Sequence, residues 1–460
     1  MHKTGGYEMK EEFRILSTTA ILGYGFPKES FDEGMKRKPN VIAVDAGSTD
    51  PGPYYLGAGI SFTDRDAVKR DLEIMIEAGV KNNIPVIIGT AGGSGGDIHL
   101  SWCENIVNEI AKERDLKFKL ALIHAEFEKD KIKESLRNNK IEPLGPVPKL
   151  SEEIIDETTR IVGQMGIEPF IKALDNGADV ILAGRTYDPS VFAAPAIRAG
   201  YDKALALHLG KILECSSICS TPGSGSDCMF GYLGEDYFRL EPLNPIRKCT
   251  TVSVAAHTLY EKTNPYILPG PGGHLDLTEC EFEQINDNMV KVSGSKFVES
   301  VKKTIKLEGA RLIGYRTISI AGARDPIMIE KIDEIIEGVK ERVRDNFKDK
   351  NWDYYLNINI YGRNGVMGSI EPSPKITSHE IGVVIEAVGE SQHKADTICA
   401  FARSSMLHFG YEGRKATAGN LAFPYSPSDF HAGEVYNFSI YHLMEVDNME
   451  SIFKINYIQM

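Results

Sequence analysis

Apolar and polar positions alternate in two distinct ways along the first 200 residues of the chain. Short, nearly continuous apolar runs are typical of strands buried on both faces, and they occur at 14–22, 40–44, 85–89, 120–124 and 179–183. The segments between them have the apolar period of helices, at 63–78, 98–114, 151–174 and 189–199. Buried strands that alternate with helices predict a doubly wound parallel sheet with helices on both faces.

The middle of the chain has a different pattern. Residues 221–298 are rich in glycine, proline and aromatic residues, and the run LPGPGG at 268–273 cannot form regular structure. Short alternating stretches at 275–281 and 289–292 indicate hairpins. We therefore expect a β-rich insertion in this region.

Regular elements return beyond residue 310. Strand-like runs occur at 315–320, 354–361, 381–388 and 435–443, and amphipathic segments at 326–347 and 391–408. The order β-α-β-β-α-β predicts a ferredoxin-like α+β domain. The predicted fold class is thus α/β, with an α/β domain over 1–309 and a ferredoxin-like domain over 310–460.

Composition and charge narrow the class of protein. The 460 residues are 42% hydrophobic and 25% charged, which is typical of a globular chain. The net charge of −13 argues against a nucleic-acid partner. Residues 1–10 lack the apolar core of a signal peptide, and no run is long enough to span a bilayer. Seven cysteines without metal-site spacing favour reduced thiols, so we expect a cytoplasmic protein without a membrane partner.

Two carboxylates and two hydroxyls follow the expected strand at 40–44, in the run VDAGSTDPGP. Open α/β sheets bind ligands at the carboxyl ends of their strands. Asp45 and Asp50 are therefore candidates for proton transfer or for binding a divalent cation, and Ser48 and Thr49 for substrate contacts. The alternative is an Asx-turn in which a hydroxyl caps a helix.

A glycine-rich loop, GTAGGSGGD at 89–97, lies between an expected strand and helix. Free backbone amides at a helix start favour an anion such as a carboxylate, a phosphate or the pyrophosphate of CoA. The loop lacks the lysine of a Walker loop and the spacing of a dinucleotide fingerprint, so it gives no indication of NAD. A turn without a ligand is the alternative. The expected anion-binding residues are Gly92, Gly93, Ser94, Gly95, Gly96 and Asp97.

Two further strand ends carry chemical groups. His124 and Glu126 alternate along a strand and would point to one side, so a histidine could transfer protons while the carboxylate orients it. A purely structural histidine is the alternative. In the run AGRTYDP, Arg185 suits carboxylate or phosphate recognition. Asp188 is either a ligand contact or the N-cap of the helix that begins at Pro189.

Later segments provide weaker candidates. Lys211 lies at helical spacing from His208 and Glu214, which fits either a functional cluster or an exposed charged stripe. Small-residue and long loops contribute three more ligand-contact candidates, Ser224, Arg414 and Asn420.

Together these loops resemble the acyclic terpene utilisation AtuA-like family. The matching runs are VDAGSTDPGPYYLGAG from residue 44, GTAGGSGGD from 89, AGRTYDPSVFAAPA from 183, STPGSGSD from 220 and GRKATAGNLAFPYSPSD from 413. The resemblance covers nearly the whole chain. It implies a bacterial catabolic setting of acyl-CoA, branched-chain acid or terpenoid degradation, and it assigns no catalytic residue.

The expected function is that of a catabolic enzyme acting on a small carboxylic acid or its acyl-CoA thioester. Glycine loops and Arg185 would hold the anion, and Asp45, Asp50, His124 and Glu126 would supply acid–base chemistry for a lyase of the hydratase/dehydratase type or an isomerase. The alternatives are a non-catalytic ligand-binding subunit and a metal-assisted hydrolase or ligase. We expect a small anionic substrate and a homo-oligomer, with a small accessory subunit left open. The cofactor is undetermined: a divalent cation remains open, and nothing indicates NAD or haem.

Overall fold

A computed structural model describes residues 11–460, and chain contacts divide it into two units. The first unit comprises the described residues up to Arg311 together with Phe438–Met460, and the second comprises Leu312–Asn437. The stretch 1–10, for which we expected no signal-peptide core, lies outside the described residues.

The first unit is built on a ten-stranded mixed sheet in the order β12-β13-β9-β8-β1-β2-β3-β7-β4-β19. Its centre is parallel and consists of β1 (Phe13–Ser17), β2 (Val41–Asp45), β3 (Val86–Gly89), β7 (Val180–Ala183) and β4 (Lys119–Ile123). Antiparallel strands extend both edges: β8 (Met229–Leu233), β9 (Tyr237–Pro242), β13 (Val290–Ser293), β12 (Glu281–Gln284) and β19 (Ile455–Gln459). The mixed α/β class is confirmed, but the expectation of a wholly parallel sheet is wrong, because strands of the β-rich segment and a C-terminal strand join its edges.

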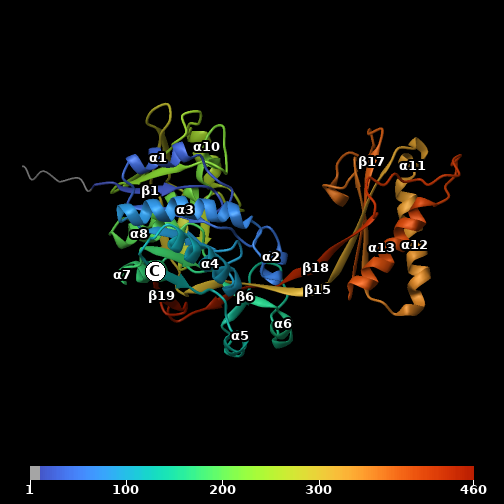
Figure 1. Ribbon diagram of the computed structural model, residues 1–460, viewed down its shortest axis with the longest axis horizontal. Coiled ribbons are helices and arrows are strands. Elements are labelled where there is room, and N and C mark those ends of the chain that lie inside the picture. Colours follow the sequence, from blue (N-terminus) through green and yellow to red (C-terminus); the bar gives the residue numbers. More distant parts are fainter. Residues whose placement is uncertain (1–10) are drawn as a thin grey trace, which may run out of the picture. The chain divides into compact units, whose positions relative to one another are not determined.

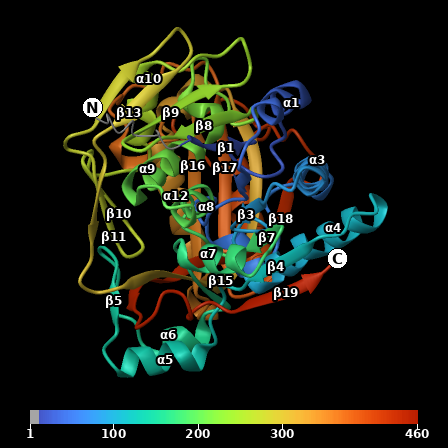
Figure 2. The same ribbon diagram turned by 90° about the vertical axis from the view of Figure 1, so that its left-hand side faces the viewer.

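Alternate side chains of the parallel strands enter two separate cores. Ile15, Ala43 and Ile87 belong to one core, and Leu16 and Ile88 to the other. The first core includes residues of α7 (Glu168–Asp175), α8 (Ser190–Arg198) and α9 (Lys203–Leu213). The second includes residues of α1 (Lys28–Lys36), α3 (Arg65–Asn82) and α4 (Asp97–Glu113). Helices therefore cover both faces of the sheet, as Figure 2 shows for α3 and α4 on one side and α7 and α8 on the other.

Short elements complete the first unit. They are α2 (Pro53–Ala58), α5 (Lys129–Arg137), β5 (Ile141–Pro143), α6 (Glu152–Glu157), β6 (Arg160–Gly163), a 3-10 turn at Ser216–Cys219, α10 (Thr251–Thr258), and a small sheet of β10 (Ile267–Gly270), β11 (Gly273–Asp276) and β14 (Lys296–Glu299). The expected helix over 151–174 is wrong. The segment forms α6, β6 and α7, because Gly163 pairs opposite Leu307 of a distant strand and Gly166 also disfavours a helix. None of the helices within 11–460 is long and apolar enough to cross a bilayer.

The second unit has antiparallel strands with two long helices packed against them. Along the chain it contains β15 (Thr304–Ala323), α11 (Pro326–Glu330), α12 (Ile332–Phe347), β16 (Tyr354–Tyr361), β17 (Ile381–Gly389), α13 (Gln392–Leu407) and β18 (Asp429–Glu445), with 3-10 turns at Lys348–Lys350 and Gly368–Ile370. The strand order is β16-β17-β15-β18. Val383 of the sheet shares a core with Ile335 and Ile398 of α12 and α13, which run side by side in Figure 1.

The second unit ends earlier than the expected domain over 310–460. Strands β15 and β18 are 20 and 17 residues long, and each continues beyond the second unit. The far part of β18 pairs with β5, and the chain then forms β19 in the ten-stranded sheet. Residues 438–460 therefore belong to the first unit, which the order of the elements in the sequence did not reveal.

Candidate functional site

Three loops pack tightly at the carboxyl ends of β2, β3 and β7. The amide of Arg185 donates a hydrogen bond to Gly95 O at 3.0 Å. A Cβ added at Gly95 would lie 2.2 Å from Arg185 N, one at Gly184 would lie 2.6 Å from Gly95 O, and one at Gly47 would lie 2.5 Å from Gly93 O. The glycines therefore allow one backbone to approach another at this edge of the sheet.

This packing makes Gly95 sensitive to substitution. Gly95→Ala should lower the free energy of unfolding by about 2–4 kcal/mol, because the new methyl group meets immobile backbone and because φ at Gly95 is +70°. Gly177→Ala is the matched control: its φ is +72°, close to that of Gly95, but no atom lies within 4 Å of the added Cβ, so only the backbone cost of about 1–2 kcal/mol should appear. Urea denaturation of both variants measures the difference, and equal losses would contradict the packing argument.

Arg185 is the centre of a buried charge network. Its Nε donates to Glu308 Oε2 at 2.7 Å, and its Nη1 donates to Thr186 O at 2.7 Å and Asp188 Oδ1 at 3.1 Å. Lys306 Nζ lies 2.7 Å from Glu308 Oε1. Burial alone would raise the pKa of Glu308, but the cations of Arg185 and Lys306 outweigh it and lower this pKa to about 2. Glu308 therefore stays charged and fixes the position of the Arg185 guanidinium.

Asp45, the last residue of β2, lies close enough to Arg185 and Asp188 of this network to interact with their charges. Its side chain is buried, and Gly47 N donates to its Oδ2 at 3.3 Å. Burial and the nearby Asp188 carboxylate raise the pKa of Asp45 well above its ordinary value, against the opposing effect of Arg185. Burial therefore favours the protonated form of Asp45 more than it would for an exposed aspartate.

A cavity of about 340 Å³ lies next to the buried charges, within the first unit. Its lining brings ionisable side chains together from distant segments: Asp50, Arg185, Tyr187, Asp188, Lys211, Glu214, Glu261, Lys262 and Lys306, with Leu144, Gln164, Pro269 and Tyr441. Acidic and basic groups are present in similar numbers, so the cavity suits proton transfer near an anion better than binding of a bare cation.

Lys211 of α9 and Glu214, directly after this helix, form an ion pair that faces the cavity. Their side chains are only 3% and 5% exposed, so the alternative of an exposed charged stripe is wrong. Burial raises the pKa of Glu214 to about 7, although Lys211 opposes the shift. A carboxyl that titrates near neutrality can both accept and donate a proton. His208, at the same helical spacing, instead bonds to Ser295 and Thr258 away from this pair.

The other residues of the loop after β2 divide between the cavity and the buried network. Asp50 lines the cavity and accepts a hydrogen bond from Ser48 Oγ at 2.8 Å. Thr49 is buried, and its Oγ1 donates to Glu308 Oε1 at 2.9 Å. Over residues 11–460 there is no group of three or more His, Cys, Asp or Glu side chains placed to hold a metal ion.

The glycine-rich loop ends at the N-terminus of α4, where a backbone amide already bonds to a side chain of the protein. Asp97 N, the first residue of α4, donates to Glu126 Oε2 at 2.8 Å. The Asp97 side chain in turn lies 2.9 Å from His124 Nδ1, and Asn456 Nδ2 lies 3.0 Å from His124 Nε2. The expected pairing of His124 with Glu126 is therefore wrong, because β4 ends at Ile123 and the alternation of side chains stops there. Among the described residues, neither is part of the lining of the Arg185 cavity.

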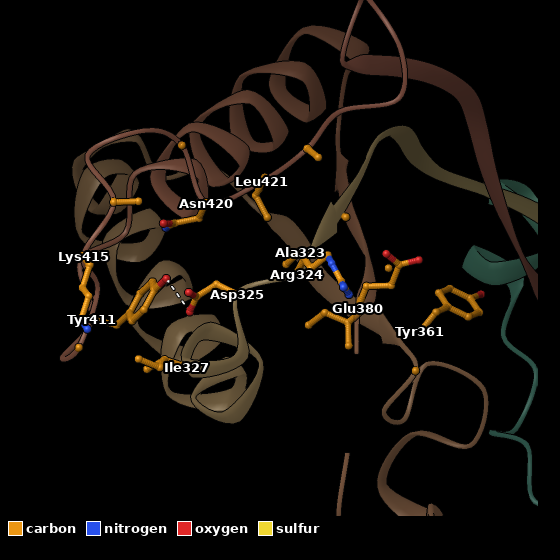
Figure 3. Close-up of a pocket in the computed structure, with 18 residues that line it drawn as sticks. Ala323, Arg324, Asp325, Ile327, Tyr361, Glu380, Tyr411, Lys415, Asn420 and Leu421 are labelled. Atoms are coloured by element: carbon orange, nitrogen blue, oxygen red, sulfur yellow. Dashed lines mark hydrogen bonds between the residues drawn. The ribbon is translucent and has the colours of Figure 1, made fainter. Parts of the chain in front are cut away.

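The remaining candidates stabilise loops elsewhere. Ser224 Oγ accepts from Ser226 N at 3.1 Å within a turn. In the second unit, Arg414 Nη2 donates to Ala418 O at 2.6 Å. Asn420 Nδ2 donates to Met406 O and Phe409 O at the end of α13. Asn420 also lines a second cavity, which lies within the second unit (Figure 3).

Comparison with known proteins gives one family. The model of the acyclic terpene utilisation family protein AtuA matches residues 64–226 and 247–428, which is most of the chain. Comparison with curated proteins and with solved structures gives no significant match. Arg185, Lys211, Glu214 and Glu308 lie inside the matched ranges, whereas the loop that carries Asp45 precedes them.

Proposed function

The chain belongs to the acyclic terpene utilisation family of AtuA proteins, and from this premise we propose that it is a catabolic enzyme for a small carboxylic acid or its acyl-CoA thioester. The proposed reaction is that of a hydratase or dehydratase, or of an isomerase. One observation supports it most: Glu214, a buried carboxyl with a pKa of about 7, faces a cavity at the carboxyl ends of parallel strands.

Hydration of an α,β-unsaturated acid or thioester, its reverse, and isomerisation by a double-bond shift or inversion at the α-carbon all involve removal or addition of a proton at the carbon next to the carbonyl group. A base is most effective when its pKa lies near the working pH, which Glu214 satisfies. Burial raises the pKa of the Tyr187 phenol, so Tyr187 would remain a proton donor on the same cavity. Glu214 is thus the proposed base, with Tyr187 as a hydrogen-bond donor to the developing enolate oxygen.

The substrate anion would contact the lysines of the cavity. Lys262 lines it and, within the part of the chain that the structure describes, makes no ion pair. Burial and the neighbouring Lys211 lower the pKa of Lys262, which an anionic ligand would reverse. Arg185 already bonds to Glu308 and Asp188, so its proposed role is to position the loop after β7 and not to clamp the substrate.

Exchange of carbon-bound hydrogen tests this function directly. The full-length protein is incubated in D₂O with a panel of small carboxylic acids and acyl-CoA thioesters, and mass spectrometry measures deuterium at the carbon next to the carbonyl. We expect exchange with at least one compound, and Glu214→Gln should slow it by about 100-fold or more. Glu235→Gln changes an exposed turn residue and should exchange like the unmodified protein.

Two results would contradict the proposal. One is equal exchange by Glu214→Gln and the unmodified protein. The other is binding of an acid or thioester without any exchange, which would instead support a non-catalytic ligand-binding subunit.

A further inference from the structure

The second unit contains a cavity of about 1120 Å³ at the ends of β15, β16 and β17. The loop that follows α13 forms the opposite wall, as Figure 3 shows for Tyr411, Lys415, Asn420 and Leu421. Eight of the 18 lining residues are glycine or alanine. The cavity is therefore open in part because many residues of its walls have little or no side chain.

Two of the glycines are not explained by the fold. Gly322 of β15 and Gly382 of β17 lie directly opposite each other in the sheet. Neither has a positive φ. A Cβ added at Gly322 would meet only Ile381 O, at 3.8 Å, and one added at Gly382 would meet only Tyr361 Cβ, at 3.5 Å. Glycine inside a strand costs stability, and it is found at bulges, at bends and where a ligand or another backbone approaches closely. Gly322 also bonds to the backbone of Ala422, but neither glycine needs to lack a side chain for packing, so the space above both is open to a ligand.

The rim of the cavity carries exposed charges of both signs. Lys415 is exposed and, across residues 11–460, forms no ion pair. Arg324 Nη1 donates to His379 O at 3.0 Å, which leaves the other guanidinium donors for a ligand. Asp325 is already used, because it accepts from Met328 N and from Tyr411 OH. In Figure 3, Glu380 lies beside Arg324, on the side of the cavity away from Lys415.

We propose that this cavity binds a planar heteroaromatic ring linked to ribose and phosphate, as in an adenine nucleotide. The paired glycines form a flat surface on which the ring can lie against peptide groups. The cations of Lys415 and Arg324 suit phosphate oxygens, and the Glu380 carboxylate can accept hydrogen bonds from ribose hydroxyls. The cavity is large enough for such a ligand.

This chemistry has two sources, a free nucleotide and the nucleotide part of CoA. Isothermal titration of the full chain with ADP, CoA and adenosine distinguishes them. Tighter binding of CoA than of ADP identifies CoA as the ligand, and equal or tighter binding of ADP identifies a free nucleotide. Either result supports the site, independently of the proposed reaction in the first unit.

Two variants locate the binding. Gly322→Val places a β-branched side chain in the open space, so it should weaken ADP binding by about tenfold or more without lowering stability, because valine suits a strand. Gly410→Val is the matched control, since it makes the same change at a residue that does not line the cavity and its added Cβ has no neighbour within 4 Å. Lys415→Ala should weaken ADP binding several-fold and leave adenosine binding unchanged.

The proposal is overturned if neither ADP nor CoA binds at about 1 mM, which corresponds to a binding free energy weaker than about −4 kcal/mol. It is also overturned if a folded Gly322→Val protein binds ADP as the unmodified chain does. Should Gly322→Val fail to fold, the Lys415→Ala result decides: unchanged ADP affinity contradicts the site.

Discussion

Arg185→Met is expected to lower the free energy of unfolding by about 3–5 kcal/mol, because it leaves buried carboxylates without their main cation. The Glu308 side chain is fully buried and bonds to Arg185 Nε. Asp188 would lose its ion pair with the same guanidinium. Denaturation in urea at pH 7 measures the loss, and circular dichroism shows whether the variant still folds.

A double-mutant cycle separates the ion pair from the packing of the arginine side chain. Glu308→Gln alone should also destabilise, because it leaves Arg185 partly unpaired. The double variant Arg185→Met/Glu308→Gln should be less destabilised than the sum of the two single variants by at least about 1 kcal/mol. Additive losses would show that the two side chains do not stabilise each other.

The stability of the protein should fall between pH 5 and pH 7.5 through the titration of Glu214. The folded state holds the pKa of this carboxyl at about 7, whereas its ordinary value is 4.5. Between these values the folded chain binds more protons than the unfolded chain, so each rise in pH favours unfolding. The full contribution is roughly 3 kcal/mol, present at low pH and lost as pH rises to 7.

Comparing the stability of the unmodified protein with that of Glu214→Gln separates the contribution of Glu214 from those of other titratable groups. The stability of the unmodified protein minus that of Glu214→Gln should decrease by roughly 2 kcal/mol from pH 5 to pH 7.5, because the rest of the contribution is already lost below pH 5. For Glu308→Gln the same difference should stay constant, because the pKa of Glu308 is about 2 and its carboxyl is charged throughout this range. A constant difference for both variants would refute the raised pKa of Glu214.

Local sequence patterns were sufficient to predict the elements that are stabilised mainly by their own residues. The strand expected at 85–89 is β3 (Val86–Gly89), and the helix expected at 98–114 is α4 (Asp97–Glu113). Such elements combine an apolar period with capping residues or glycine at their ends. Several elements were missed, including the nine-residue helices α1 and α5. Two of the missed strands, β6 and β19, are only four and five residues long, and distant strands pair with them.

The candidate site was only partly predictable for a related reason. The position of Arg185 after a parallel strand indicated a site, because strand order alone brings such loops together. Its main partner, Glu308, lies 123 residues further on, in a segment whose alternating pattern gave no sign of a buried charge. Glu214 was visible as one member of a helical charge spacing, but its burial depends on packing that the spacing cannot reveal.

The place of β19 has a consequence for synthesis of the protein. Residues 455–459 pair with the whole of β4, which otherwise forms an edge of the ten-stranded sheet. Asn456 of β19 follows His124, directly after β4, by 332 residues. During translation the hydrogen-bonding groups of this edge therefore remain unpaired until more than 300 further residues have been added. An open, apolar edge strand is a template for pairing with another chain. Products that stop before residue 455 would therefore expose β4 and favour aggregation, whatever the condition of their catalytic residues.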